Sequence, residues 1–218
     1  MPALPQAGTP EQWDTLLADD AALRAGVETL LQRHGHSGSA LHRYDSGSLP
    51  VYAVGTQAVL KLYPPRDAAH AAVETQVLAW VDGRLPLRTP QPLASGTQDG
   101  WHYLLMAQLP GQRLVEVWPE LDARERASLC DRLGETVAAL HALDFRPLVD
   151  LPWPAWQPFM AAQRASAVQR QRQRGLDAHW LAQIDAFLDA WAPLPSDARV
   201  LLHTEIMREH LMVERRSD

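Results

Sequence analysis

Apolar residues near the start of the chain recur at helical spacing. A pattern typical of a capping box, with proline at the first helical position, stands at Thr9-Pro10-Glu11-Gln12. The apolar positions on the following face are Trp13, Leu16, Leu17, Leu23, Val27 and Leu30. Their spacing predicts one amphipathic helix that begins at about Pro10 and ends near Gly35.

The spacing then changes to short runs that are typical of strands. These runs cover residues 40–44, 50–54 and 58–62, and small polar turns separate them at residues 45–48 and 55–57. Short apolar runs divided by turns that contain Gly and Ser predict an antiparallel meander. Pro64-Pro65 ends the third run.

The rest of the chain has fewer strand-like runs and becomes mainly helical. We predict a helix over residues 67–81, strands over 92–95 and 101–106, helices over 122–143 and 177–191 with another between them, a short strand over 199–202 and a loop over 203–210. Pro110-Gly111 marks a break between the strand-rich and helical parts. The sequence therefore predicts an α+β chain with two lobes, residues 1–109 and residues 110–218.

Composition and charge narrow the class of protein. The chain is 46% hydrophobic and 21% charged, which is typical of globular proteins, and no stretch approaches the roughly 18 apolar residues of a membrane helix. No signal peptide is evident, and Cys130 alone cannot form an internal disulfide, so we expect a cytoplasmic protein. The net charge of -6 disfavours nucleic acid as a partner and suits a small cationic molecule.

Lysine occurs once in the chain. The other basic residues are arginine, and Lys61 lies inside the strand-like run at residues 58–62. A lysine ammonium is a compact charge on a flexible stem and can reach phosphate oxygens. Composition leaves two interpretations open, a phosphate ligand or an edge-strand charge without a special function.

Lys61 belongs to an ordered set of features that suits phosphoryl transfer. A Ser-Gly-Ser turn at residues 46–48 precedes it, Glu74 follows it in the predicted helix, and the loop at residues 203–210 lies far downstream. Proteins catalyse phosphoryl transfer mainly by positioning and charge neutralisation. A small-residue turn can approach phosphates, a helix glutamate can hold the lysine, and an acidic loop residue can accept the hydroxyl proton.

This ordered set resembles the aminoglycoside phosphotransferase and choline kinase-like family, and its layout is similar to that of hygromycin B kinases. The resemblance extends over about residues 41–213, and the segments that carry it are VLKLY at 59–63, ETQVL at 74–78, YLLMAQLPG at 103–111, LH at 140–141 and LLHTE at 201–205. It implies a bilobal protein-kinase-like fold with a nucleotide-binding, antiparallel-sheet lobe that has one key helix. A mostly helical second lobe would carry the catalytic loop. The implied activity is O-phosphorylation of a small cationic molecule, hygromycin B above all, with ATP and Mg²⁺ as cofactors.

The resemblance also implies roles for residues of the first lobe. Lys61 would bind the ATP phosphates, and Glu74 would pair with Lys61. The other residues expected around the nucleotide are Ser46, Gly47 and Ser48 over the phosphates, and Met106, Ala107 and Leu109 in the hinge beside adenine. The Ala107 carbonyl and the Leu109 amide would face the base.

In the second lobe the resemblance implies that His203 shapes the catalytic loop, that Glu205 is the general base and that His210 is a metal ligand. The family normally has aspartate in place of Glu205 and asparagine in place of His210. Glutamate places its carboxylate one methylene further out, and a shift of ~1 Å at a reacting centre can cost ~100-fold in rate. Magnesium prefers oxygen ligands, so a histidine suits it poorly.

Family members continue beyond the loop with a second metal-binding aspartate and further helices. The chain ends at Asp218, so we expect it to be C-terminally incomplete and to have little activity of its own. Two alternatives stay open. One is a non-catalytic nucleotide-binding module of kinase fold, and the other is a kinase of another small alcohol such as choline, homoserine or a sugar.

Overall fold

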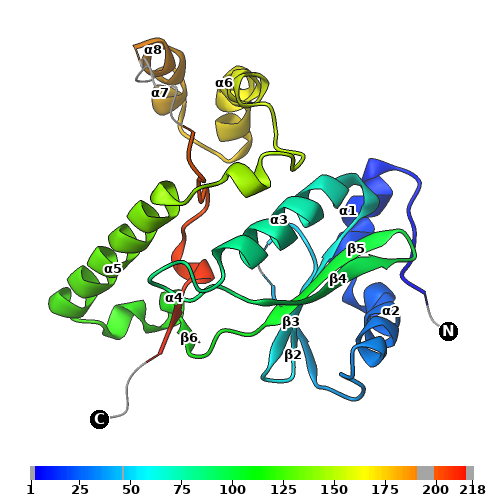
Figure 1. Ribbon diagram of the computed structural model, residues 1–218. Coiled ribbons are helices and arrows are strands. Elements are labelled where there is room, and N and C mark those ends of the chain that lie inside the picture. Colours follow the sequence, from blue (N-terminus) through cyan, green and yellow to red (C-terminus); the bar gives the residue numbers. More distant parts are fainter. Residues whose placement is uncertain (1–2, 46, 191–198, 215–218) are drawn as a thin grey trace. The chain divides into compact units, whose positions relative to one another are not determined.

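The computed structural model describes residues 3–45, 47–190 and 199–214. The chain forms two compact units, one made of Met1–Leu151 with Val200–Asp218 and the other of Pro152–Arg199. Figure 1 shows the sheet and its flanking helices in the larger unit.

A five-stranded sheet forms the centre of the larger unit. Its strands are β1 (Leu41–Arg43), β2 (Val51–Val54), β3 (Ala58–Tyr63), β4 (Pro92–Gln98) and β5 (Trp101–Ala107). The spatial order is β1-β2-β3-β5-β4, and all neighbours pair antiparallel. The predicted meander and the two later strands are confirmed, although β4 continues to Gln98.

The side chains of β3 alternate between the two faces of the sheet. Leu60 and Leu62 are fully buried in a core cluster that includes residues of the helices preceding the sheet. Val59 and Tyr63 pack in a second cluster with residues of α3 (Ala68–Val81). Lys61 lies between Val59 and Tyr63 in this alternation, so it shares the face of the sheet that α3 covers.

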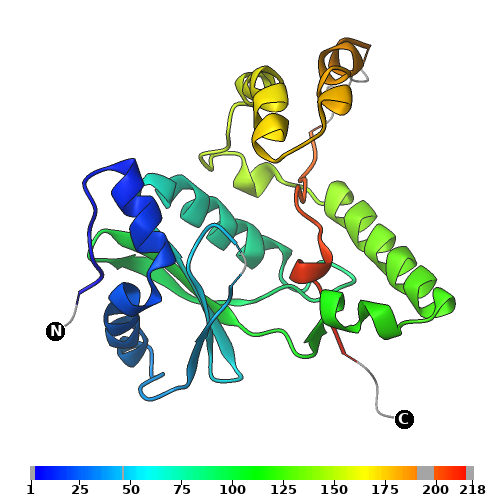
Figure 2. The same ribbon diagram turned by 180° about the vertical axis from the view of Figure 1, so that it is seen from behind.

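Two helices, α1 (Pro10–Ala18) and α2 (Asp20–Arg33), stand where one helix was predicted (Figure 2). The capping box at Thr9 is present, as predicted. Asp19 has extended backbone, and its side chain accepts a hydrogen bond from the Ala22 N–H at 3.0 Å, which caps α2. The prediction of one continuous helix was wrong because Asp19 binds a backbone N–H of the following turn, while both helices bury apolar residues against the same core.

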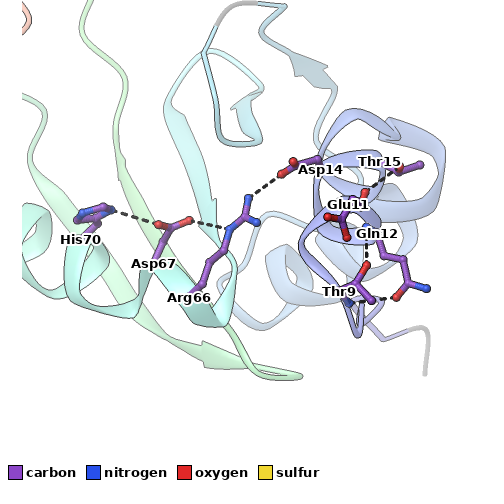
Figure 3. A network of polar contacts seen from close by, with 8 residues as sticks. All are labelled: Thr9, Glu11, Gln12, Asp14, Thr15, Arg66, Asp67 and His70. Atoms are coloured by element: carbon purple, nitrogen blue, oxygen red, sulfur yellow. Dashed lines mark hydrogen bonds and ion pairs between the residues drawn. The ribbon is translucent and has the colours of Figure 1, made fainter. Parts of the chain in front are cut away.

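Polar contacts connect α1 with the start of α3 (Figure 3). Arg66 belongs to the short helix η1 (Pro65–Asp67), and its guanidinium lies 2.9 Å from the Asp14 carboxylate and 3.8 Å from that of Asp67. Asp67 is in turn 3.3 Å from the His70 ring on α3. Largely exposed ion pairs of this kind contribute little to stability. Their consequence is geometric, since they connect α1 to the turn from which α3 begins.

Helical segments and a second, two-stranded sheet complete the larger unit. Their bounds are β6 (Gln112–Arg113), α4 (Leu114–Val117), η2 (Trp118–Glu120), α5 (Ala123–Ala142), η3 (Arg146–Leu148), η4 (Arg208–His210) and β7 (Met212–Val213). The predicted capping box of Asp122 and Glu125 opens α5. Strands β6 and β7 pair antiparallel, so the segment after β5 contacts the far end of the chain.

The strand predicted at residues 199–202 does not form within the described part of the chain. Leu201 is 7% exposed and packs in a cluster with Val81, Leu140 and Leu148, whereas Leu202 is 52% exposed. The apolar run at residues 200–202 therefore buries Leu201 but does not pair as a strand. The pairing that the sequence did not reveal occurs further on, in β7.

Gly111 makes the β6–β7 pairing possible. Its φ of +105° is a backbone conformation that residues with a Cβ rarely adopt. A Cβ at this position would also clash with the Val213 carbonyl oxygen. Glycine is required here both by the backbone conformation and by the close approach of the partner strand.

The smaller unit contains α6 (Trp156–Gln173), α7 (Ala178–Leu181) and α8 (Ile184–Ala190). The prediction of one helix over residues 177–191 was wrong for the residues that the structure describes, and residue 191 lies outside them. The Gln183 backbone N–H donates to the Trp180 carbonyl at 3.1 Å, and the Gln183 side-chain amide donates to the His179 carbonyl, also at 3.1 Å. The side chain thus takes the acceptor that a continuous helix would have used.

Across the described ranges, every helix is too short or too polar to cross a membrane.

Candidate active site

Lys61 on β3 and Glu74 on α3 form an ion pair between the sheet and the helix. The Lys61 Nζ lies 2.7 Å from one Glu74 carboxylate oxygen and 3.0 Å from the other. The two side chains are 24% and 33% exposed, so the pair is partly buried. The predicted meeting of these two side chains is observed, whereas their catalytic role remains a prediction.

Regular secondary structure places both members of the pair. Lys61 is held between Val51 on β2 and Leu104 on β5 by the sheet register. Glu74 lies near the middle of α3, whose residue Ala71 packs in the same cluster as Leu104. A partly desolvated pair adds little net stability, because desolvation offsets the attraction. The pair therefore fixes the position of an ammonium more than it stabilises the fold.

The turn predicted to cover phosphates joins β1 and β2. Ser46 lies outside the described residues. Gly47 has a φ of +109°, and both Gly47 and Ser48 are exposed. Leu49, directly after the turn, packs in the cluster that contains Val59 and Tyr63. The turn consequently returns to the sheet on the same face as Lys61, which is compatible with the predicted role.

The predicted hinge follows β5 and is held by backbone hydrogen bonds. Met106 is 7% exposed and pairs with Val59 in the sheet. The Ala107 N–H donates to the Gln91 carbonyl at 2.8 Å, and the N–H of the next residue donates to the Gln57 carbonyl at 2.9 Å. Leu109 is partly buried. These bonds fix the path of the segment, while its contact with a base stays a prediction.

The residues predicted to form the catalytic loop lie together. The Glu205 N–H donates to the His203 Nδ1 at 3.4 Å, and the His210 Nδ1 is 3.1 Å from the Glu205 carbonyl oxygen. Because a carbonyl only accepts, this His210 nitrogen carries the proton, which leaves Nε2 available as an acceptor or ligand. All three side chains are exposed.

The loop is anchored at both ends. Leu201 precedes it in the buried cluster described above. After the loop, the Leu114 N–H donates to the Leu211 carbonyl at 2.7 Å, and β7 pairs with β6. Between these anchors the Arg208 guanidinium stacks over the Trp118 ring, 5.6 Å from its centroid. Contacts with residues outside the loop thus determine the path of a segment that has little regular secondary structure.

The two groups of candidate residues share no polar contact among the described residues. No hydrogen bond or ion pair within the described ranges connects His203, Glu205 or His210 with the Lys61–Glu74 pair. Nor do these ranges contain a group of three or more His, Cys, Asp or Glu side chains that could hold a metal ion. Magnesium favours a set of oxygen ligands. The residues described here do not fit a magnesium site, and the role of His210 as a metal ligand stays a prediction.

Tyr63 is a residue of this region that the sequence analysis missed. The Lys61 Nζ lies 5.2 Å from the centroid of its ring. The signal was present in the sequence, because residues two apart in a strand point to the same face. A tyrosine two positions from the single lysine could therefore have been placed beside it.

Comparisons with known proteins agree with this geometry. The model of APH, described as the phosphotransferase enzyme family, matches residues 40–218. A comparison with curated proteins gives no match. Among solved structures, the GDP and kanamycin complex of APH(2")-IIia is similar over 88% of this chain, with a TM-score of 0.68 and 17% identity. The macrolide 2'-phosphotransferase MphH from Brachybacterium faecium, an apoenzyme, is similar over 86% of the chain, with a TM-score of 0.57 and 23% identity.

A third similar structure is the streptomycin-ATP-APH(2")-IIa ternary complex, which matches 74% of the chain with a TM-score of 0.50 and 15% identity. The chain spans 67% of the length of the first two structures and 58% of the third. At these identities the likeness concerns the fold. The predicted α+β, kinase-like fold is confirmed.

Proposed function

The chain belongs to the phosphotransferase enzyme family, and we propose that it moves the γ-phosphate of ATP to a hydroxyl of a small cationic molecule. The observation that carries this proposal is the Lys61–Glu74 ion pair at 2.7 Å. An ammonium on a central strand of a sheet, held by a carboxylate of the neighbouring helix, is a recurring part of kinase-type phosphoryl transfer.

In this proposal the residues of the sheet bind and orient the nucleotide. Lys61 donates to phosphate oxygens, and Glu74 keeps the ammonium directed toward them. The turn that contains Gly47 and Ser48 presents backbone N–H groups to the phosphates. The hinge at residues 106–109 contacts the base. None of these steps requires the protein to form a covalent bond, since positioning and charge neutralisation supply the catalysis.

Residues of the loop act on the acceptor. Glu205 accepts the proton of the acceptor hydroxyl as that oxygen attacks the γ-phosphorus, and the bond from the γ-phosphorus to the bridging oxygen breaks to release ADP. His203 and His210 support the loop through the two contacts that they make with the Glu205 backbone.

An aminoglycoside is the acceptor class that we propose, with hygromycin B as the first compound to test. The similar structures support the class, since one contains kanamycin and another contains streptomycin with ATP. The net charge of -6 suits a polycationic acceptor. Because one similar structure contains GDP, guanine nucleotides belong in the same experiment.

A nucleotide-binding module without transfer activity is the second candidate. The exposure of Glu205, and its separation from the Lys61–Glu74 pair among the described contacts, favour this candidate. It predicts that nucleotide binds at Lys61 but that no acceptor is phosphorylated.

The single lysine permits a direct test of the nucleotide site. An acyl-phosphate derivative of ATP acylates amines beside bound phosphates, and Lys61 is the only side-chain amine of the chain. We expect labelling of Lys61 that excess ATP prevents, measured by mass spectrometry. In a control variant, Arg146→Lys, the added lysine is highly exposed, and ATP should not protect it.

Transfer is tested separately by product mass. The protein is incubated with ATP or GTP and with hygromycin B, kanamycin, choline or homoserine in turn. A phosphorylated aminoglycoside supports the proposed function. Protection of Lys61 without any phosphorylated product supports the module, and failure of both ATP and GTP to protect Lys61 rejects both candidates.

A further inference from the structure

Tyr63 combines complete burial with an unpaired hydroxyl. Its side chain is 0% exposed, and its hydroxyl makes no hydrogen bond of normal geometry with any of the described residues. Buried polar groups are normally paired, because an unpaired one loses its hydration without compensation. Phenylalanine would fill the same space without that cost. The hydroxyl therefore needs an explanation other than packing.

The surroundings of Tyr63 point to the Lys61–Glu74 pair. The ring lies beneath the ammonium, 5.2 Å from Nζ to the centroid. Burial raises the pKa of the phenol, and the neighbouring Glu74 carboxylate raises this pKa further. The hydroxyl thus lies close enough to Glu74 for the carboxylate to act on it through its charge and as a nearby acceptor, although the two do not form a hydrogen bond of normal geometry.

We propose that Tyr63 is a positioning residue for nucleotide binding, whose hydroxyl donates a hydrogen bond to the Glu74 carboxylate when Lys61 turns to the phosphates. This inference rests on the proposed function, because it assigns Lys61 to phosphate oxygens. Both Glu74 oxygens now accept from the same Nζ. When phosphates compete for the Lys61 ammonium, the partly buried Glu74 carboxylate loses some of the hydrogen bonding that offsets its desolvation. If the Glu74 side chain then moves slightly toward Tyr63, the Tyr63 hydroxyl becomes a second hydrogen-bond donor to the carboxylate. This donor lowers the free-energy cost of ATP binding.

The proposal predicts effects of opposite sign in the free and bound states. Without nucleotide, the hydroxyl is an unpaired buried group, so Tyr63→Phe should leave the melting temperature unchanged or raise it. With nucleotide, the variant lacks the second donor, so the Kd for ATP should rise about tenfold and the ATP-induced shift in melting temperature should shrink. A tyrosine that serves packing alone would not produce this combination.

Tyr52 provides a matched control. It is also 0% exposed, with an unpaired hydroxyl that lies beside an acidic residue, but this residue is Asp20 on α2. Tyr52 packs in the cluster on the opposite face of the sheet from Lys61. Tyr52→Phe removes the same atom from an equally buried site, and the Kd for ATP should not change.

A double-mutant cycle tests whether Tyr63 acts through Glu74. Kd values for ATP are measured by protection of Lys61 from acylation in the wild type, Tyr63→Phe, Glu74→Ala and the double variant. We expect Tyr63→Phe to weaken binding in the wild-type background and to have less than about a twofold effect in the Glu74→Ala background. An equal loss in both backgrounds, or no loss in the wild-type background, overturns this inference and leaves the proposed function intact. If neither ATP nor GTP protects wild-type Lys61, the proposed function itself fails, and the inference fails with it.

Discussion

The Lys61–Glu74 pair and the loop with His203, Glu205 and His210 are held in different ways. The pair is partly buried and lies on a strand and a helix whose backbones are hydrogen-bonded throughout. The loop side chains are exposed, and the loop is held to the rest of the unit at its two ends and by Arg208 over the Trp118 ring. A change in the sheet should therefore move the pair directly, whereas the loop should respond most to changes in its anchors.

The largest effect is expected from the loop acid. Glu205→Gln removes the group that we propose as acceptor of the hydroxyl proton, so kcat should fall about a thousandfold while KM for both substrates changes little. Steady-state kinetics of aminoglycoside phosphorylation measure this split. An unchanged kcat would mean that Glu205 only shapes the loop. Thr204→Ser, a conservative change at the neighbouring exposed residue, is the control.

The next largest effect is expected from the lysine. Lys61→Met keeps the length of the stem but removes the charge that binds phosphates, so kcat/KM for ATP should fall about a hundredfold. Equilibrium binding of ATP should weaken as well, which distinguishes this variant from Glu205→Gln. Normal ATP binding by Lys61→Met would remove the lysine from the site.

A smaller effect is expected from a change at the anchor of the loop. Gly111→Ala places a Cβ against the Val213 carbonyl and strains a positive φ, which should destabilise the protein by about 1–3 kcal/mol. Since the strain acts on β6 and β7, kcat should fall while ATP still protects Lys61 from acylation. Gly55→Ala, which has a positive φ but open space around its Cβ, controls for backbone strain alone. Equal losses of kcat in both variants would contradict the anchoring role of β6 and β7.

The smallest effect is expected from the contacts shown in Figure 3. Asp14→Asn removes the charge that Arg66 faces at 2.9 Å. The pair is largely exposed, so the free energy of unfolding should fall by less than about 1 kcal/mol, and less still at high salt. Urea unfolding at two salt concentrations measures both. A larger loss would show that α1 does more to hold α3 than its exposed contacts suggest.

The sequence predicted what depends on local spacing and missed what depends on distant contacts. The strand periodicity around Lys61 and the helix that carries Glu74 could be predicted because both patterns are local. The pairing of Lys61 with Glu74 was expected from the family resemblance and not from these patterns. The break at Asp19 was missed because a capping side chain interrupts a periodicity that continues across it. The strand at residues 199–202 was predicted wrongly because one buried leucine produces the same apolar run as a strand. The pairing of β6 with β7 leaves no local pattern.

The pairing of Gln112 with Val213 joins positions about a hundred residues apart in the chain. The entropic cost of closing a loop rises with its length, and contacts between distant residues are slow to form. During synthesis the whole of the five-stranded sheet leaves the ribosome long before Met212 and Val213 do. Domains fold from the N-terminal side as the chain is made. The Lys61 ammonium of β3 and the Glu74 carboxylate of α3 can therefore meet in the growing polypeptide, whereas the loop with Glu205 receives its second anchor only as translation reaches β7.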